Sequence, residues 1–278
     1  MDLEQIFQTP HPVIGVVHLL PLPSSPRWGG NLKTVRERAE QEATALAAGG
    51  VDGIIIENFF DAPFPKNQVD PAVVSAMSLI VQRVMNLVML PIGINVLRND
   101  AKSAIAIASC VNAQFIRVNV LNGIMATDQG LIEGQAHELM RYRRELGADV
   151  SILADVCVKH AYPLGNPPLA TAVQETVERG LADGIIISGG TTGVPPQLED
   201  LETAAAAGGK PIFIGSGATW DNIPQLLKAA DGAIVASSLK RNGDVKNPID
   251  PIRVSQFVEA VRETENRLEE KFPFSAKA

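Results

Sequence analysis

The stretch Lys210-Pro-Ile-Phe-Ile-Gly-Ser-Gly-Ala-Thr219, followed by Ala230-Asp-Gly-Ala-Ile-Val-Ala-Ser-Ser-Leu-Lys240, contains two short apolar runs that each end in glycine or serine. Such runs predict buried strands, with a helix between them. Small residues directly after a strand let backbone N–H groups approach an anion, and a following helix adds its positive end. In an eight-stranded β/α barrel, phosphate groups usually bind at the loops after the last two strands. The pair therefore predicts the final strands of such a barrel.

Six earlier apolar runs, each followed by a segment with helical spacing, extend the pattern toward the N-terminus. The expected strands are residues 13–18, 53–57, 92–96, 115–119, 151–155 and 184–188. The expected helices are residues 31–48, 71–87, 100–112, a helix after a long loop to Gly130 that ends at Gly147, and residues 169–179, 196–207, 222–230 and 252–270. Eight alternating units with a terminal helix predict an α/β fold, a single (β/α)8 TIM barrel. One domain over residues 1–278 is expected, with the barrel at about 13–270, because no linker divides the chain.

A doubly wound open sheet is the competing fold. It would need a Gly-x-Gly-x-x-Gly pattern directly after the first strand. This chain has His18-Leu-Leu-Pro-Leu-Pro23 there. Only Gly215-Ser-Gly217 resembles the pattern, and by itself it is weak evidence.

Composition narrows the class of protein. A net charge of −7 argues against nucleic acid as a partner, and no polybasic run indicates binding to anionic lipid. Cys110 and Cys157 lie on apolar elements and are expected to be buried free thiols, without the spacing of a disulfide framework or a zinc site. The N-terminal residues lack the pattern of a signal peptide, so we expect a cytoplasmic protein, at most peripheral to a membrane.

Polar residues stand at the carboxyl ends of nearly all the expected strands, where chemistry collects in TIM barrels. The candidate catalytic residues are His18, Glu57, Arg117, Asn119 and Asp155. Period two places Arg117 and Asn119 on one face of their strand, and if that face points inward, Arg117 needs Glu57 or Asp155 as a partner. The alternatives stay open: His18 as a packing residue, and both carboxylates as neutralising groups rather than acids or bases.

The glycine and serine residues after the last three strands predict a phosphate site, with simple tight turns as the alternative. The candidates are Ser188, Gly189, Gly215, Ser216, Gly217, Ser237 and Ser238. No cofactor is predicted beyond a phosphate-bearing ligand. No metal is predicted, because His18, Glu57, Asp155 and His160 lack a spaced ligand motif. Lys159 is expected to be solvated or phosphate-facing rather than a Schiff-base lysine.

Aromatic residues in two long loops, Trp28 with Phe59, Phe60 and Phe64, are interpreted as loop packing, with a lid or docking surface as the alternative.

Several segments in order resemble the BtpA/SgcQ family over nearly the whole chain. They are His18-Leu-Leu-Pro-Leu-Pro23, Glu57-Asn-Phe-Phe-Asp-Ala-Pro-Phe64, Gly93-Ile-Asn-Val-Leu-Arg-Asn-Asp100, Phe115-Ile-Arg-Val-Asn119, Thr127-Asp-Gln-Gly-Leu-Ile-Glu-Gly134, Ala154-Asp-Val-Cys-Val-Lys-His160 and Pro248-Ile-Asp-Pro-Ile-Arg-Val254, together with the two stretches quoted first. Where many relatives have Gly-Thr-Ser-Leu-Lys after the eighth strand, this chain has Ala236-Ser-Ser-Leu-Lys240, so the glycine is lost and the hydroxyl remains.

The resemblance implies two functions. The cyanobacterial branch is associated with photosystem I biogenesis, at the cytoplasmic side of thylakoid membranes, and with accumulation of reaction-centre proteins. The other branch resembles sugar-metabolism operon proteins. The resemblance therefore favours a photosystem I factor with thylakoid membrane or assembly components as partners. The residues favour an enzyme acting on a phosphorylated sugar or nucleotide-like metabolite. A homo-oligomer is expected in either case.

Overall fold

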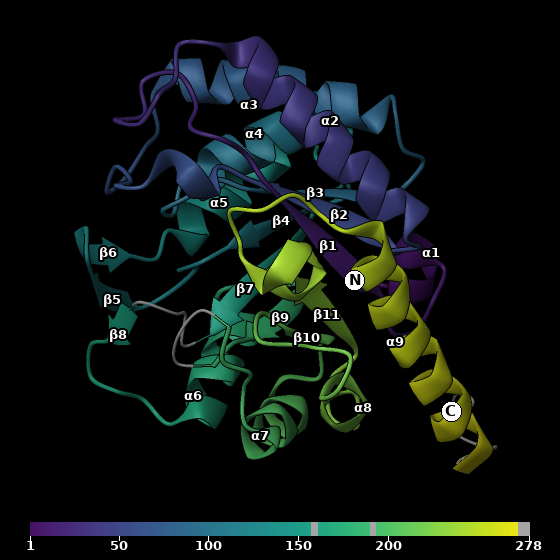
Figure 1. Cartoon of the computed structure of the whole chain (residues 1–278). Coiled ribbons are helices and arrows are strands. Elements are labelled where there is room, and N and C mark those ends of the chain that lie inside the picture. The colour runs from purple at the N-terminus through teal and green to yellow at the C-terminus, as the bar shows by residue number, and fades with distance from the viewer. Residues whose placement is uncertain (157–160, 190–192, 272–278) are drawn as a thin grey trace.

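The computed structural model describes residues 1–156, 161–189 and 193–271; Cys157, Lys159, His160 and the residues after Gly189 up to 192 lie outside this part of the chain. Within it, eight parallel strands close into a barrel in the order β1-β11-β10-β9-β7-β4-β3-β2, as Figure 1 shows. The barrel strands are β1 (Val13–His18), β2 (Gly53–Glu57), β3 (Ile92–Asn95), β4 (Phe115–Val118), β7 (Ser151–Val156), β9 (Gly184–Ile187), β10 (Ile212–Ile214) and β11 (Gly232–Val235). The predicted TIM barrel is confirmed.

Helices surround the barrel, and side chains cap the first turns of α1, α2, α3 and α4. The helices are α1 (Leu3–Phe7), α2 (Leu32–Ala48), α3 (Pro71–Met85), α4 (Ala101–Val111), α5 (Ala136–Glu145), α6 (Leu169–Gln174) continued by η2 (Glu175–Arg179), α7 (Leu198–Gly208), α8 (Ile223–Leu226) and α9 (Pro251–Lys271), with short turns η1 (Phe59–Asp61), η3 (Ser237–Leu239) and η4 (Arg241–Gly243). The Asn31 side chain accepts hydrogen bonds from the first turn of α2, and Asp70 accepts one at α3. Local sequence therefore determines where these helices begin.

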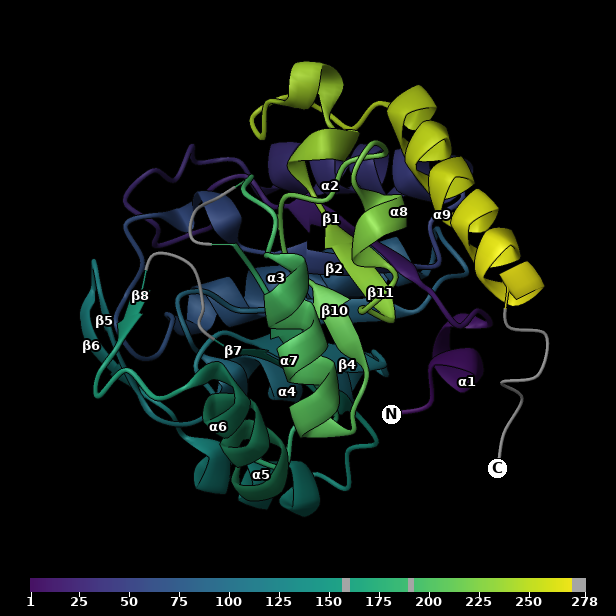
Figure 2. The same cartoon turned by 90° about the horizontal axis from the view of Figure 1, so that it is seen from below.

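Side chains that point into the barrel form a core separate from the larger core between the strands and the helices. Its members are Phe7, Ile14, Val16, Ile55, Phe115, Leu153, Ile186, Phe213 and Ile234. Phe7 of α1 packs edge-on against Phe115 at 5.6 Å between ring centroids, so α1 covers the amino-terminal end of the barrel (Figure 2). On β1, β2, β4 and β7 the last inward positions are polar, with His18, Glu57, Arg117 and Asp155 buried near the mouth.

Parts of the fold differ from the sequence prediction. The segment expected as a loop up to Gly130, together with the first residues of the helix expected after it, forms a hairpin of β5 (Ile124–Thr127) and β6 (Gly130–Glu133). The hairpin pairs with β8 (Ala161–Pro163) in a three-stranded sheet at the side of the barrel (Figures 1 and 2). The expectation that Cys110 is buried is wrong, because its position on α4 faces solvent. No helix in the described ranges has the length and apolar composition needed to cross a membrane.

Candidate functional site

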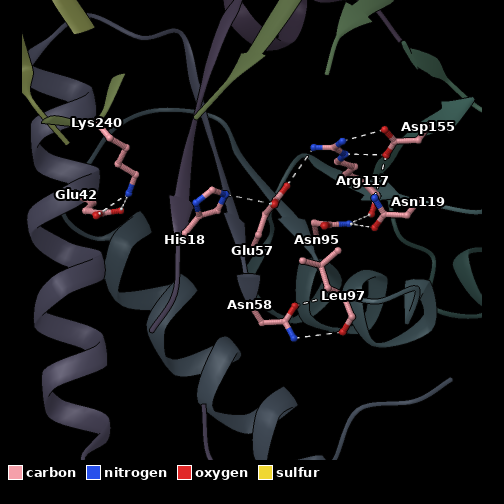
Figure 3. A network of polar contacts seen from close by, with 10 residues as sticks. All are labelled: His18, Glu42, Glu57, Asn58, Asn95, Leu97, Arg117, Asn119, Asp155 and Lys240. Atoms are coloured by element: carbon pink, nitrogen blue, oxygen red, sulfur yellow. Dashed lines mark hydrogen bonds and ion pairs between the residues drawn. The ribbon is translucent and has the colours of Figure 1, made fainter. Parts of the chain in front are cut away.

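One row of side chains crosses three neighbouring strands at the barrel mouth. His18 on β1 is the register partner of Glu57 on β2, and Glu57 is the register partner of Asn95 on β3. All three are buried and line the same cavity. The structure therefore brings His18 and Glu57 together as the sequence predicted, and Figure 3 shows Asn95 on the far side of Glu57 from His18.

Arg117 is a buried cation of the site and lies between two carboxylates. Its Nε and Nη2 donate to Asp155 at 2.8 and 2.9 Å, and its Nη1 donates to Glu57 Oε1 at 3.4 Å. Burial lowers the pKa of Arg117, but the charges and hydrogen bonds of Asp155 and Glu57 more than offset it, so the pKa is raised. The guanidinium is permanently charged and held in one orientation, and the face of β4 that carries Arg117 points into the barrel.

The orientations of two amides follow from this ion pair. The Asp155 carboxylate accepts hydrogen bonds from Arg117, and Asn119 Nδ2 donates to its Oδ2 at 3.1 Å. The Oδ1 of Asn119 therefore faces Asn95, whose Nδ2 donates to it at 3.1 Å and to the carbonyl of Arg117 at 2.8 Å. Asn95 Oδ1 is buried and accepts no hydrogen bond from the described residues.

His18 lies between a carboxylate and two aromatic rings. Its Nε2 is 3.8 Å from Glu57 Oε2. Its ring stacks on Phe59 at 4.1 Å between centroids, and Phe60 meets it edge-on at 6.1 Å. Phe60 and Phe64 line the cavity. The aromatic residues of the second loop thus form one wall of the site, while Trp28 packs against the outer core.

A buried hydrogen-bond network holds this aromatic loop in place. Asn58 donates to Asp61 at 2.9 Å and accepts from the Leu97 amide at 2.7 Å, and Asp61 accepts from the Leu22 amide at 2.7 Å. The loops after β1, β2 and β3 are therefore tied together. Burial raises the pKa of Asp61, and its hydrogen bonds counteract part of this effect.

The loops after β10 and β11 form the opposite wall of the cavity. Their lining residues are Gly215, Ser216, Gly217, Ala218, Ala236, Ser237 and Ser238. The Ser216 hydroxyl donates to the carbonyl of Val194 at 3.1 Å, and the Ser238 hydroxyl donates to that of Ala218 at 2.8 Å. These two hydroxyl protons already have acceptors, and the Gly215 amide donates to the carbonyl of Ile187 at 2.8 Å. The Ser237 hydroxyl and the other backbone amides of the two loops are the donors left for an anion.

The glycines of these loops are explained first by packing. A Cβ on Gly215 would lie 2.4 Å from Ser188 Oγ, and one on Gly217 would lie 2.2 Å from the Pro195 nitrogen. A Cβ on Gly189 would lie 2.3 Å from the Val194 carbonyl oxygen. Gly217 also has a φ of +71°. Close packing therefore accounts for glycine at these positions, and an anion site at the same loops remains a prediction.

Two interactions from outside the mouth anchor the β11 loop. The Lys240 Nζ donates to both oxygens of Glu42 on α2, at 2.8 and 2.7 Å, and both side chains are buried. Arg253 on α9 donates to the Ser238 carbonyl at 2.8 Å and lies 4.7 Å over the Trp220 ring of the β10 loop. The two loops are thus attached to each other and to the helices behind them.

The cavity between these walls has a volume of about 600 Å³. The charged residues that line it are Arg27, Arg98, Arg117, Lys246, Glu57 and Asp128. Four cations face two carboxylates, although the whole chain is acidic. Asp155 is covered by Arg117 and Asn119 and is absent from the lining. Across the described ranges, no group of three or more His, Cys, Asp or Glu side chains is arranged to hold a metal ion.

Sequence reasoning did not select Arg98 and Asn58 as site residues. Arg98 is buried at the mouth, where burial lowers its pKa more than Asp155 and other nearby charges raise it. Asn58 contacts two other loops and is fully buried. Their positions in the sequence could have identified them, because each residue follows the end of a barrel strand by one to three residues.

Comparisons of the sequence and of the fold with known proteins identify relatives of this chain. The photosystem I biogenesis protein BtpA of Synechocystis is 75% identical over 264 residues, which cover 95% of this chain and 92% of the relative. An uncharacterized protein of Pyrococcus furiosus is 49% identical and covers 89% of this chain and 93% of its own length. A solved structure of (S)-3-O-geranylgeranylglyceryl phosphate synthase from Thermoplasma acidophilum, in complex with sn-glycerol-1-phosphate, matches with a TM-score of 0.59 at 12% sequence identity. The match covers 94% of this chain and 97% of that structure's chain, and it shows that the fold is shared. The sequence model of the BtpA family matches residues 9–263, and the chain belongs to the BtpA family.

Proposed function

We propose that the protein is a photosystem I biogenesis factor that acts peripherally at the cytoplasmic face of the thylakoid membrane and is needed for accumulation of photosystem I reaction-centre proteins. The observation that carries this proposal is the 75% identity to the Synechocystis photosystem I biogenesis protein over almost the whole of both chains. At this identity the barrel and its loops are expected to be preserved together, so the two proteins should be interchangeable.

Complementation tests the proposal directly. The gene for this chain is expressed in a Synechocystis strain that lacks its 75% identical relative, and the amount of photosystem I reaction-centre subunits per cell is measured. Restoration to the wild-type level is expected, with part of the protein sedimenting with thylakoids and released by high salt. If the deletion strain has normal photosystem I, or if expression leaves a deficit unchanged, the proposal is wrong.

The second candidate is an enzyme that acts on a phosphorylated sugar or nucleotide-like metabolite by general acid/base chemistry. Its supporting observation is the mouth itself, where Glu57 and His18 face a cavity beside the permanently charged Arg117. Glu57 or His18 would move a proton, and Arg117 and Asn119 would offset developing negative charge. Asp155 would keep Arg117 and Asn119 in position. The 49% identity to an uncharacterized protein of Pyrococcus furiosus extends over most of the barrel that carries these residues.

The charges at the mouth favour a ligand that carries an anionic group. The amides of the β10 and β11 loops and the excess of cations at the mouth would attract a phosphate to this wall, with the Ser188 hydroxyl behind Gly215. The complex of the geranylgeranylglyceryl phosphate synthase shows a phosphate ester in a barrel of this fold. The proposal for this chain depends on its own residues, because that likeness extends to the fold alone.

Thermal unfolding in the presence of inorganic phosphate or ribose 5-phosphate tests the second candidate. A ligand at a hundred times its Kd stabilises by about 2.7 kcal/mol, which raises Tm by roughly 5–10 °C for a chain of this size. Ser237→Asp, which places a negative charge in the β11 loop, is expected to abolish the shift. Ser255→Asp on the exposed side of α9 is the matched control and should retain it. Absence of any shift with the unaltered protein would rule this candidate out.

A further inference from the structure

The floor of the mouth contains an acceptor that the protein itself leaves unused. Asn95 is 1% exposed and lines the cavity, and its Oδ1 accepts no hydrogen bond from the described part of the chain. A buried acceptor without a donor lowers the equilibrium constant for folding by about tenfold to a hundredfold. A bound molecule that supplies the donor recovers that cost.

The direction of this acceptor is determined by its neighbours. Exchanging the oxygen and nitrogen of Asn95 would set its oxygen against the Arg117 carbonyl and against Asn119 Oδ1, since Nδ2 now donates to both. Asn119 cannot reverse, because its Nδ2 donates to the Asp155 carboxylate. The ion pair of Arg117 with Asp155 therefore leaves the Asn95 oxygen, and not its amide nitrogen, without a hydrogen-bond partner among the described residues.

The donor that fits this position is a neutral hydroxyl. Arg98 and Arg117 line the same cavity as Glu57 and Asp128, and an ammonium group has no lone pair with which to accept a hydrogen bond from either guanidinium. A hydroxyl donates to Asn95 Oδ1 and can still accept from a guanidinium. Asn95 is also the register partner of Glu57, so a hydroxyl bound there lies next to the proposed proton-transfer group.

We infer that Asn95 is a specificity-determining residue and that the ligand is a phosphorylated hydroxy compound, a polyol or sugar phosphate, whose phosphate binds at the β10 and β11 loops and whose hydroxyl donates to Asn95 Oδ1. This inference rests on the proposed enzyme function and narrows its substrate class. In the barrel, β1 and β2 separate β11 from β3. The ligand therefore extends from the phosphate across His18 and Glu57 to Asn95.

Matched pairs of ligands test the inference with the unaltered protein. Isothermal titration calorimetry compares glycerol 3-phosphate, erythritol 4-phosphate and ribose 5-phosphate, each with the n-alkyl phosphate of the same carbon number. At least one hydroxylated member is expected to bind about tenfold to a hundredfold more tightly than its alkyl partner. In a second series, 3-hydroxypropyl phosphate should bind more tightly than 3-aminopropyl phosphate. If alkyl phosphates bind as tightly as their hydroxylated partners in every pair, the inference is overturned while the phosphate site stands. If no phosphate ester and no inorganic phosphate binds, the proposed enzyme function fails as well.

Two variants test whether Asn95 causes the preference for hydroxylated ligands. Asn95→Leu removes the acceptor at nearly constant volume and should abolish the preference for the hydroxylated member while alkyl phosphate affinity stays within about twofold. Asn99→Leu is the matched control, because Asn99 exchanges hydrogen bonds with the Val120 backbone outside the cavity. It should keep the preference. A preference that persists in Asn95→Leu contradicts the inference, and if that variant does not fold, the ligand pairs with the unaltered protein decide.

Discussion

Replacing Glu42 by leucine is expected to cost more stability than replacing its partner Lys240 by methionine. Both side chains are fully or almost fully buried and bonded to each other at 2.7 and 2.8 Å. Removing one member of a buried pair costs about 3–5 kcal/mol when the other charge is left without compensation. That condition applies to Lys240 when Glu42 is removed, so the full cost is expected for Glu42→Leu.

The opposite change leaves a smaller defect. When Lys240 is removed, Glu42 keeps a charged donor, because Arg38 Nε lies 2.7 Å from its Oε1 and the Arg38 side chain is partly exposed. We expect a cost of about 1–3 kcal/mol for Lys240→Met, the range for a weakened charged hydrogen bond. The double variant places two apolar side chains of similar volume in contact, so it should lose less than the two single variants added together.

The pH dependence provides an independent check. Burial lowers the pKa of Lys240 below its usual 10.5, and the charge of Glu42 counteracts part of that effect. Between the folded and unfolded pKa values the unfolded chain binds a proton that the folded chain has lost, so stability rises with pH there. Removing Glu42 lowers the folded pKa further and widens this window. Glu42→Leu should therefore gain stability with rising pH relative to the unaltered protein.

Urea unfolding followed by tryptophan fluorescence measures these differences at several pH values. For Glu42→Leu the midpoint is expected to fall by about 1 M at neutral pH without a change in slope. Equal losses in the two single variants would refute the role given to Arg38. A double variant whose loss equals the sum of the single losses would refute the reasoning that the pair is coupled.

Other variants test the mouth and the covered end of the barrel. Arg117→Met leaves the buried Asp155 carboxylate with Asn119 as its remaining donor and should cost about 3–5 kcal/mol in urea unfolding, whereas Arg117→Lys should cost less but still lose the bidentate geometry. Burial raises the pKa of Asp61 above 3.8, so the folded chain binds this proton more tightly than the unfolded chain does. The free energy of unfolding should therefore fall as pH rises from 3.8 to the pKa of the folded chain, which urea unfolding across acidic pH would measure. Phe7→Ala should cost about 3 kcal/mol by loss of the contact with Phe115, seen as a lower Tm.

Sequence patterns alone predicted the barrel because each element is specified locally. Buried parallel strands are apolar on both faces, so runs such as β2 and β9 were evident without knowledge of their partners. Period two was sufficient to place Arg117 and Asn119 on one face of their strand, and the structure shows that this face points inward. The hairpin of β5 and β6 was missed, because its strands pair with each other and with β8 at the side of the barrel rather than with the main sheet.

The amino-acid sequence by itself determined that His18, Glu57 and Arg117 stand at the same rim, since the carboxyl ends of all strands of a parallel barrel meet there. The tertiary structure alone decided which of these side chains are hydrogen-bonded to each other. It lets Arg117 donate two hydrogen bonds to Asp155 and a longer one to Glu57, and it leaves the buried Asn95 oxygen without a donor among the described residues. These outcomes depend on the register between strands and on the directions of neighbouring donors, which no spacing along the chain encodes.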